Sequence, residues 1–194
     1  MNIMLLIIGI VFILFLIFNF LYFILPSLSP IPFFPSNKKD LPLICTTLLA
    51  INKKSTIIDL GAGTGTVLFP TAQEAHKNNL NTQFIAVEIH PLLILIMYMR
   101  RLLHPNRKNI RIIRANMLTV DYNILLQNIN TQSSIVFYLY IGQGVIEQLK
   151  KRLVLIKRNI AIVSYMYDIP GWDTYSTNRQ KGQHTLTTYQ YHSM

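Results

Sequence analysis

Three glycines at alternating positions follow an acidic residue and indicate a ligand site. Gly61, Gly63 and Gly65 come directly after Asp59-Leu60, which ends a short β-branched run. Glycine adopts positive φ angles and has no Cβ, so a loop of this composition lets its backbone approach a ligand closely. A buried strand, a glycine turn and the start of a helix together predict a nucleotide-like cofactor in a doubly wound sheet.

The spacing of the glycines distinguishes between cofactors. A nicotinamide or flavin site has the pattern G-x-G-x-x-G. That pattern would put the third glycine at position 66, where the chain has Thr66. The alternative is a glycine-rich turn with no ligand, because short motifs occur by chance.

A second acidic residue ends the next apolar run, Phe84 to Glu88. It stands about twenty residues beyond the glycine loop, where dinucleotide sites carry the acid that binds the ribose. A carboxylate at this strand end can accept hydrogen bonds from both ribose hydroxyls, and its charge disfavours a 2′-phosphorylated cofactor. A strand that merely exposes a charge at its end is the competing interpretation.

The N-terminal residues predict a transmembrane helix. The run from Ile3 to Leu25 has no charged residue. About 23 helical residues cover the ~30 Å hydrocarbon core of a bilayer. A cleaved signal peptide is the competing interpretation, but no basic region precedes the run and no small-residue cleavage site follows it. Lysines follow the run at positions 38, 39, 53 and 54, so we expect a single-pass membrane protein with its catalytic domain in the cytoplasm.

The remaining composition limits the partners. The formal net charge of +10 lies outside the apolar run. For a tethered domain this charge predicts contact with an anionic lipid surface, and no nucleic acid is expected. The single cysteine, Cys45, excludes an intrachain disulfide, and the five histidines show no ligand spacing, so no metal is expected.

Helix-like and strand-like segments alternate after the apolar run. We expect a transmembrane helix within residues 1–25, a proline-rich connector over 26–42 and one domain over 43–194. The fold class is α/β, a Rossmann-like, doubly wound, mostly parallel sheet. Helices are expected near 40–51, 66–79, 91–103 and 145–156, and strands near 55–60, 83–88, 110–114, 134–140 and 159–165. The tail from His184 to Tyr191 is expected to add an antiparallel strand.

With these elements in order, the glycine loop at 59–65 resembles motif I of the class I S-adenosylmethionine-dependent methyltransferases. Within them the chain looks like the membrane-anchored family of the ATP synthase c-subunit lysine N-methyltransferase and its prokaryotic relatives. The resemblance covers nearly the whole chain. It rests on the N-terminal apolar run, the glycine loop and four further stretches: Pro32-Phe-Phe-Pro35-Ser36, Glu88-Ile-His-Pro91, Ile135 to Tyr140 and Val163 to Trp172.

The resemblance implies S-adenosyl-L-methionine as the cofactor. Its implied binding residues are Asp59, Gly61, Ala62, Gly63, Gly65, Glu88 and Asn116. Asn116 departs from the family, which usually has an acid there, but its side-chain carbonyl can still accept a hydrogen bond from an adenine amino group. The Asp/Asn-Pro-Pro-Tyr signature of many amino-methylating enzymes is also absent, since the chain has Leu139-Tyr-Ile-Gly142.

Two groups of side chains are candidates for the methyl-acceptor site. Tyr138 and Tyr140 lie two apart on a strand and so share one face, where they act in catalysis or simply pack the sheet. Tyr165, Asp168 and Trp172 are expected near the mouth of the site, where aromatic rings could hold a cation. A lysine with a pKa near 10.4 must lose its proton before it reacts, which a dry aromatic pocket favours.

Three functions remain open at this point. The resemblance and the predicted tether favour a protein lysine N-methyltransferase acting on a membrane or membrane-proximal protein. Methylation of a lipid, a quinone or another small molecule is the second. A cofactor-binding module without turnover is the third, because Asn116 replaces the usual acid and no general base is evident.

Overall fold

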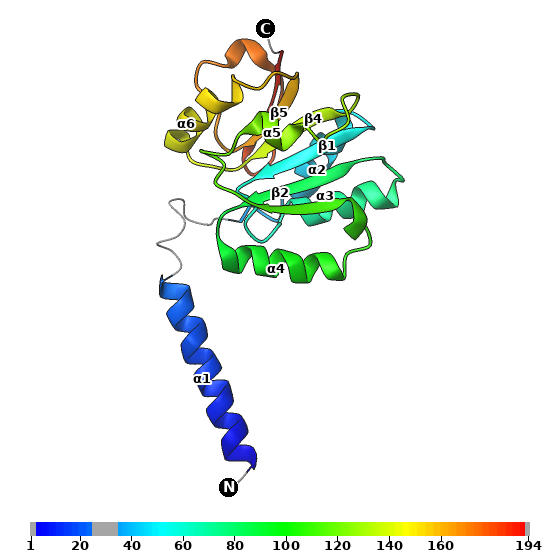
Figure 1. Ribbon diagram of the computed structural model, residues 1–194. Helices are drawn as coiled ribbons and strands as arrows, with labels where there is room; N and C mark the ends of the chain where they lie inside the picture. Colours follow the sequence, from blue (N-terminus) through cyan, green and yellow to red (C-terminus); the bar gives the residue numbers. More distant parts are fainter. Residues whose placement is uncertain (1–2, 25–34, 193–194) are drawn as a thin grey trace. The chain divides into compact units, whose positions relative to one another are not determined.

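The computed structural model describes residues 3–24 and 35–192 and divides into two units, Met1–Phe33 and Phe34–Met194 (Figure 1). The first unit contains helix α1 (Ile3–Ile24), which has 22 residues. Its large apolar side chains from Ile3 to Ile17 are exposed by 48–74%. No helix in the described part of the chain has both the length and the apolar character that crossing a membrane requires. The predicted transmembrane segment is therefore not shown.

The second unit alternates strands and helices. Its helices are α2 (Leu41–Ala50), α3 (Leu68–Lys77), α4 (Pro91–Leu102), α5 (Tyr122–Leu126) and α6 (Gln143–Leu153), with short 3-10 turns η2 (Arg107–Asn109) and η3 (Asp173–Tyr175). Its strands are β1 (Ser55–Leu60), β2 (Gln83–Glu88), β3 (Ile110–Arg114), β4 (Ser134–Leu139), β5 (Ile160–Tyr165), β6 (Ser176–Lys181) and β7 (Thr185–Tyr191).

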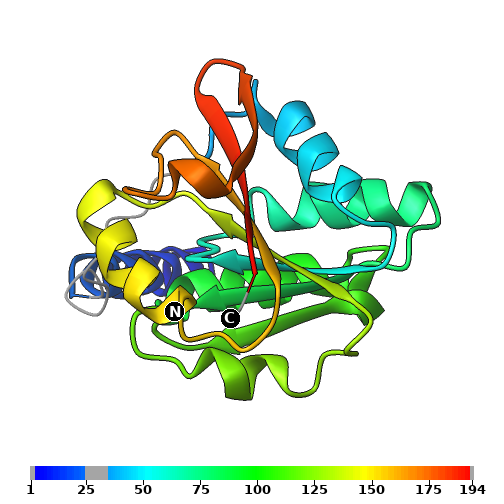
Figure 2. The ribbon, with the colours of Figure 1, turned by 90° about the horizontal axis from the view of Figure 1, so that it is seen from above.

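All seven strands form one sheet in the order β3-β2-β1-β4-β5-β7-β6. The first five strands in the chain are parallel, while β7 runs antiparallel to both β5 and β6. Figure 2 shows this twisted sheet with helices on both sides. The mostly parallel α/β fold predicted from the sequence is confirmed.

Alternate residues of the buried strands face two helical layers. Ile57 and Phe84 belong to one core with residues of α2, α3 and α4. On the opposite face, Phe137 meets the ring of Tyr122 in α5 edge-on at 5.6 Å. Because side chains alternate along a strand, Asp59 shares a face with Ile57. The acid before the glycine loop therefore lies on the side of the sheet that α2 and α3 cover.

The predicted elements match the observed ones with two exceptions. The antiparallel C-terminal strand is present as β7, next to β5. The sequence analysis missed β6, because its residues Ser-Thr-Asn-Arg-Gln-Lys are polar and mostly exposed and so give no apolar alternation. It also missed α5, which at five residues is too short to show a helical period.

One buried carboxylate joins the start of the domain to its end. Asp40, just before α2, accepts hydrogen bonds from the Tyr165 hydroxyl at 2.7 Å and from the backbone N–H groups of Gln183 at 2.7 Å and His184 at 3.0 Å. Burial alone would raise the pKa of Asp40, but these hydrogen bonds outweigh it and lower the pKa. Asp40 thus fixes β5 and the β6–β7 turn to the segment that precedes α2.

Asp40→Asn should therefore destabilise the domain at neutral pH. The side-chain amide of asparagine would point N–H donors at groups that are themselves donors, so hydrogen bonds would be lost. Each hydrogen bond to a charged group is worth roughly 1.5–3 kcal/mol. We expect the free energy of unfolding to fall by about 2–4 kcal/mol in a denaturant titration. Because the pKa of Asp40 is lowered, the stabilisation is present above the ordinary pKa of an aspartate and is lost as the pH falls through the folded value. The difference in the free energy of unfolding between wild type and Asp40→Asn should therefore become smaller in acid. A difference that does not depend on pH would contradict this role of Asp40.

Candidate functional site

The candidate site lies where the parallel strands end. β1 occupies the point at which the strand order reverses, with β2 on one side and β4 on the other. In open α/β sheets, ligands bind outside the carboxyl ends of the strands at such a reversal. The glycine loop, Glu88 and Tyr140 all follow directly from these strand ends.

The glycine loop requires glycine at each of its three positions. The φ angles of Gly61, Gly63 and Gly65 are +77°, +58° and +74°. A Cβ on Gly65 would lie 2.5 Å from the ring of Phe69. The backbone N–H groups of Gly61 and Ala62 donate to the Val87 carbonyl at 2.9 and 3.1 Å. The loop is therefore held close to the end of β2, with little side-chain bulk between it and a ligand.

Glu88 connects the glycine loop after β1 to the turn between β2 and α4. Its Oε2 accepts a hydrogen bond from the Gly63 N–H at 2.8 Å. Its Oε1 accepts from the N–H groups of Ile89 at 2.7 Å and His90 at 2.9 Å. The predicted partner of the ribose hydroxyls thus also shapes the loop, and the unused lone pairs of its oxygens remain available to a ligand.

Asp59 is a buried carboxylate without a hydrogen-bond donor. It is 5% exposed, and no described residue donates a hydrogen bond to its side chain. Burial, and secondarily the nearby charge of Glu88, raises its pKa to about 7. A buried acid of this kind is costly to ionise unless a cation accompanies it. The site is therefore suited to a ligand that brings a positive charge.

Asn116 lies beside Glu88 but already has a structural contact. The Ala115 N–H donates to the Glu88 carbonyl at 3.0 Å, which holds the end of β3 against β2. The Asn116 Oδ1 accepts a hydrogen bond from the Leu118 N–H at 2.9 Å. Its predicted contact with an adenine amino group stays a prediction, to be made with the second lone pair of the same oxygen.

Tyr138 in β4 and Tyr140 just after it occupy different environments. Tyr138 is 2% exposed, and its hydroxyl lies 2.9 Å from the Ser36 hydroxyl. Tyr140 is partly exposed, and its ring meets that of Tyr165 edge-on at 5.0 Å. Burial raises the pKa of both Tyr138 and Tyr140, so both remain neutral phenols at physiological pH. Tyr140 is the one of the pair that a substrate can reach.

The residues expected at the mouth of the site are not brought together. Trp172 stacks on Tyr191 at 5.1 Å, and Tyr191 pairs with Ile160 at the far end of β5 from Tyr165. Asp168 accepts hydrogen bonds from Thr187 at 2.8 Å and from Tyr189 at 3.2 Å, and it pairs with Arg179 at 2.9 Å. Of this group, Tyr165 alone contacts Tyr140. Asp168 and Trp172 help to hold the β6–β7 hairpin.

Two residues at the site had no predicted role. The Nδ1 atom of His90 is buried, and no described group bonds to it. His90 stands two residues after Glu88, so its place in the Glu88-Ile-His-Pro91 turn was the available signal. Ser36 belongs to the predicted proline-aromatic stretch, and its hydroxyl lies 2.9 Å from that of Tyr138, a contact that no sequence pattern indicated. The rest of the predicted proline-aromatic stretch, residues 32–34, lies outside the described residues.

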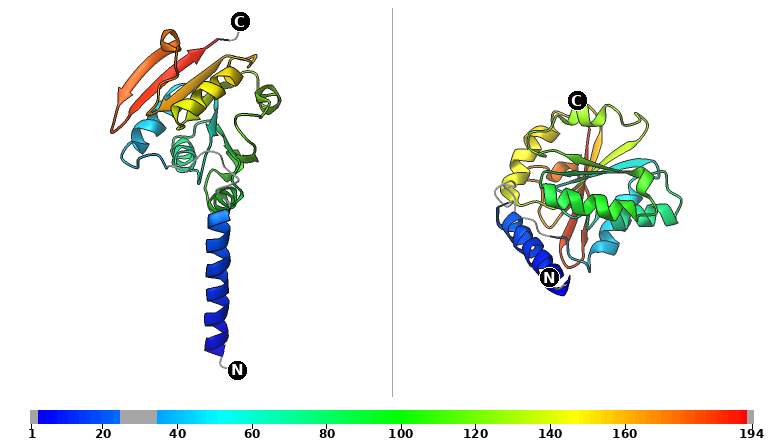
Figure 3. Two further views of the ribbon diagram at one scale, coloured as in Figure 1. Left: turned by 90° about the vertical axis from the view of Figure 1, so that its left-hand side faces the viewer. Right: turned by 60° about the horizontal axis from the view of Figure 1, so that its bottom comes forward.

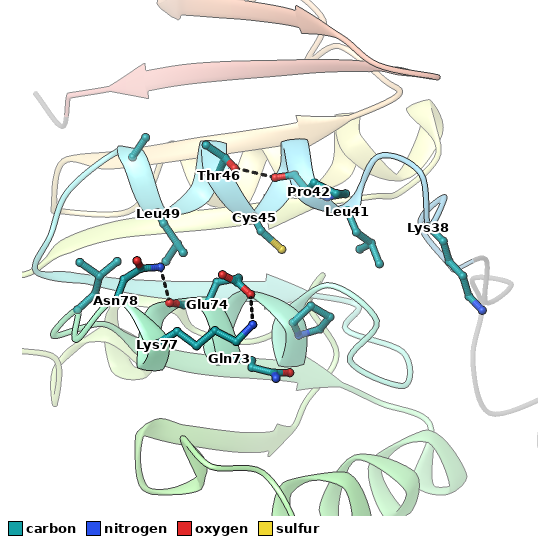
Figure 4. Close-up of a pocket in the computed structure, with 13 residues that line it drawn as sticks. Lys38, Leu41, Pro42, Cys45, Thr46, Leu49, Gln73, Glu74, Lys77 and Asn78 are labelled. Carbon is teal, nitrogen blue, oxygen red and sulfur yellow. Dashed lines mark hydrogen bonds and ion pairs between the residues drawn. The ribbon is translucent and has the colours of Figure 1, made fainter.

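A separate groove of about 650 Å³ lies between α2 and α3 (Figure 4). Cys45 lines it and lies 3.3 Å from the Thr71 hydroxyl, and burial raises the pKa of its thiol. Lys38 and Glu74 also line it. None of the glycine-loop residues lines this groove, so it is distinct from the candidate site. Over residues 3–24 and 35–192 no cluster of His, Cys, Asp and Glu has the arrangement of a metal site.

Known structures share the fold of this domain. An RNA methyltransferase from Salinibacter ruber, solved with S-adenosyl-L-homocysteine, aligns with a TM-score of 0.63 at 15% identity, over 81% of this chain and 93% of that one. The rRNA methyltransferase aviRa from Streptomyces viridochromogenes aligns with a TM-score of 0.54 at 16% identity, over 84% and 88%. The chain has the class I S-adenosylmethionine-dependent methyltransferase fold. No family model matches it.

One curated protein adds a similarity in sequence. The ATP synthase c-subunit lysine N-methyltransferase of Caenorhabditis elegans is 25% identical over 168 residues, which cover 83% of this chain and 80% of that protein. Together the similarities support a methyltransferase with S-adenosylmethionine as its cofactor, as the sequence predicts. The resemblance to the lysine-methylating family, drawn from the glycine loop and the element order, agrees with this relative.

The buried carboxylate of this methyltransferase fold should lower its stability. Because the pKa of Asp59 is raised on folding, its ionisation costs nothing in acid and costs progressively more as the pH rises from its unfolded value to about 7. Each pKa unit corresponds to about 1.4 kcal/mol. We expect Asp59→Asn to raise the free energy of unfolding by up to about 3 kcal/mol at pH ~8 and to leave it nearly unchanged at pH ~4.

Asp173→Asn is the matched control, because Asp173 is exposed on η3. It should leave stability unchanged at both pH values, as measured by thermal and denaturant unfolding. A destabilised Asp59→Asn at alkaline pH would show that the carboxylate has a partner that it stabilises.

Proposed function

We propose that this protein is an S-adenosylmethionine-dependent methyltransferase that modifies a lysine side chain of a protein at or near a membrane. The observation that supports S-adenosylmethionine as the cofactor is the Asp59 carboxylate, which has no hydrogen-bond donor among the described residues and lies beside a loop of three positive-φ glycines. S-Adenosylmethionine has an ammonium group that can neutralise such an acid and ribose hydroxyls that can donate to Glu88.

The bound cofactor supplies an electrophilic methyl group on a sulfonium. The protein's part is to orient the reactants and to exclude water. The Gly61–Gly65 backbone and Glu88 fix the cofactor's position, and Asp59 balances its positive charge. Tyr140 presents a neutral phenol at the end of β4, where its hydroxyl can hydrogen-bond an attacking amine. Its role is positioning, because its raised pKa keeps it from acting as a phenolate base at neutral pH.

The lysine substrate rests on the similarity to the Caenorhabditis elegans enzyme. An amine nucleophile must be deprotonated, and the Tyr140–Tyr165 pair supplies an apolar surface that disfavours an ammonium. Methylation of a lipid, a quinone or another small molecule is served by the same cofactor site. A module that binds the cofactor without turnover is the third alternative on this fold.

RNA is a further candidate substrate, favoured by two observations. The structural neighbours from Salinibacter ruber and Streptomyces viridochromogenes are RNA methyltransferases. The net charge of +10 would attract a polyanion. A shared fold does not determine the substrate, however, so the choice between RNA and protein is left to direct labelling.

Membrane attachment is part of the proposal. The sequence has no charge from Ile3 to Leu25, and the side chains of α1 from Ile3 to Ile17 are exposed large apolar groups apart from Gly9. A helix with apolar side chains on every face has no polar side to present to water. We therefore expect α1 to lie in the bilayer with the folded domain in the cytoplasm. A tether of this kind would raise the effective concentration of substrates in the same membrane.

Cofactor binding provides the first test. The Asp59 carboxylate must be ionised to pair with the ligand's ammonium, so affinity for S-adenosylmethionine should rise as the pH increases through about 7. Calorimetry on the full-length protein should show affinity roughly tenfold higher one pH unit above this value than one unit below it. Asp59→Asn should bind at least about tenfold more weakly and lose this dependence, since a charged hydrogen bond is worth roughly 1.5–3 kcal/mol.

Glu88→Gln should also weaken binding, and Asp173→Asn should not. Equal affinity for Glu88→Gln and wild type would remove Glu88 from the site. Binding of NAD in place of S-adenosylmethionine would overturn the proposed cofactor.

The methyl acceptor can be identified by labelling. Membranes and cytosol incubated with the protein and methyl-labelled S-adenosylmethionine should yield label in a protein band that survives delipidation and nuclease. Hydrolysis of that band should release methyl-lysine. Label that is extracted into organic solvent indicates a lipid or small molecule, label lost on nuclease treatment indicates RNA, and cofactor binding without label indicates a module without turnover.

Membrane attachment is tested by alkaline carbonate extraction of cells that make the full-length protein. The protein should stay with the membranes, and a reporter fused to its C-terminus should be found in the cytoplasm. Release of the intact protein by carbonate would show that α1 does not hold it in the bilayer.

A further inference from the structure

Helix α4 has apolar side chains on two faces, and no other element of the described chain covers one of these faces. Ile94 and Met97 are buried in the core. On the outer side Leu95, Tyr98, Met99 and Leu102 are 46–66% exposed, and Leu103 just beyond the helix is 92% exposed. These positions recur at intervals of three, four and seven residues, so they form one continuous stripe along the helix. We call Leu95, Tyr98, Met99, Leu102 and Leu103 the α4 stripe.

The α4 stripe lies at the edge of the folded domain. α4 packs on β3, and β3 is the edge strand of the sheet. Figure 3 shows α4 as the outermost element on this side of the domain. A contiguous exposed apolar stripe of this kind marks an interaction surface in soluble domains.

The charge around the stripe has one sign. Six basic residues and no acidic residue occur between His90 and Val120: Arg100, Arg101, Arg107, Lys108, Arg111 and Arg114. The ion pairs between described residues are Lys77–Glu74 and Arg179–Asp168, so none of the six is neutralised by a carboxylate. The surface therefore combines exposed apolar side chains with uncompensated positive charge.

Two of these basic residues mark the two ends of α4. Lys108 follows the C-terminal end of the helix, in the turn η2. Arg114 pairs in register with Glu88, three residues before the helix begins at Pro91. Ile112 packs against the core that contains Ile94 and Met97, and Arg114 shares its face of β3. Both side chains are exposed and make no hydrogen bond or ion pair with another described residue.

We infer that the α4 stripe and its basic flanks dock on an anionic lipid bilayer. An interfacial helix inserts its apolar side chains at the headgroup boundary, while Lys and Arg contact anionic headgroups. A nucleic acid fits this surface less well, because single-stranded sites stack bases on aromatic rings and the stripe has one aromatic residue, Tyr98. A protein partner would need, on its own surface, an apolar strip surrounded by acidic groups that match the α4 stripe.

Docking through α4 would place the cofactor site at the membrane surface. α4 begins at Pro91, three residues after Glu88, which accepts hydrogen bonds from Gly63 of the glycine loop and from His90 just before the helix. The orientation of the site relative to the bilayer would then be fixed by the domain itself. This inference is independent of α1, since carbonate extraction tests α1 and a local probe tests α4.

A fluorescent probe on single cysteines tests the inference in the full-length protein. Leu102→Cys places the probe on the stripe, where Leu102 is 66% exposed. Leu155→Cys is the matched control, since Leu155 is 61% exposed and follows α6 on the opposite face of the sheet. Cys45 is buried and its thiol pKa is raised, so the introduced thiol reacts first. Each labelled protein is reconstituted in phosphatidylcholine vesicles with or without phosphatidylserine and with a lipid-borne quencher.

We expect the probe at position 102 to shift to the blue and to be quenched in phosphatidylserine vesicles, and the probe at position 155 to remain unaffected. Cofactor affinity of both labelled proteins checks that they are folded. Quenching at neither position, equal quenching at both, or quenching at 155 alone would overturn the inference. A probe at 102 that responds equally in vesicles without phosphatidylserine would remove the electrostatic part of it.

Charge substitutions provide an independent measurement. Lys108→Gln with Arg114→Gln, in the Leu102→Cys protein, should reduce the docking equilibrium by roughly fivefold for each charge removed. Lys151→Gln with Lys157→Gln removes the same charge from exposed positions in and after α6 and should have no such effect. Equal loss in both double variants would show that net charge, and not this surface, determines docking.

Discussion

The candidate site depends on one carboxylate that binds three backbone N–H groups. Glu88 reaches from the end of β2 to Gly63 in the loop after β1, and also to Ile89 and His90 at the start of α4. A loop of positive-φ glycines has many accessible conformations, so its shape must be fixed by contacts from outside the loop. The charge-assisted hydrogen bonds of Glu88 supply such contacts, and they leave the loop open to a ligand.

The second carboxylate of the site has the opposite character. Glu88 accepts hydrogen bonds from three backbone N–H groups, whereas Asp59 is buried without a donor. The two acids therefore have different roles. Glu88 fixes the conformation of the loop, and Asp59 can pair with a positively charged ligand. Binding sites commonly retain groups that reduce stability, because those groups are satisfied only by the ligand. In this protein the expected loss of folding stability comes from one residue, Asp59, near the C-terminal end of β1.

The sequence predicted the parts of the fold that have strong local signals. β1, β2 and β3 match the expected ranges because they are short apolar runs bounded by polar residues or glycine, and Pro91 marks the start of α4. The glycine loop, Asp59 and Glu88 could be proposed as site residues from the sequence because their spacing is itself the motif. The polar edge strand β6 gave no such signal. The structure separates Trp172 from Tyr165, because Trp172 packs on β7, which closeness in sequence did not show. The role of Tyr165, Asp168 and Trp172 at a substrate pocket stays a prediction. Ser36 on Tyr138 and Asp40 on Tyr165 are long-range contacts, which no local pattern encodes.

The Asp40 contacts have a consequence for how the protein is made. Asp40 binds partners 125, 143 and 144 residues further along the chain. During synthesis α1 leaves the ribosome before the domain does, and the domain cannot close until Gln183 and His184 have also emerged. Domains fold in the order in which their residues become available, and contacts this distant in sequence form late. The apolar side chains of α1 are therefore already outside the ribosome throughout the period in which the sheet that follows in the sequence is still incomplete.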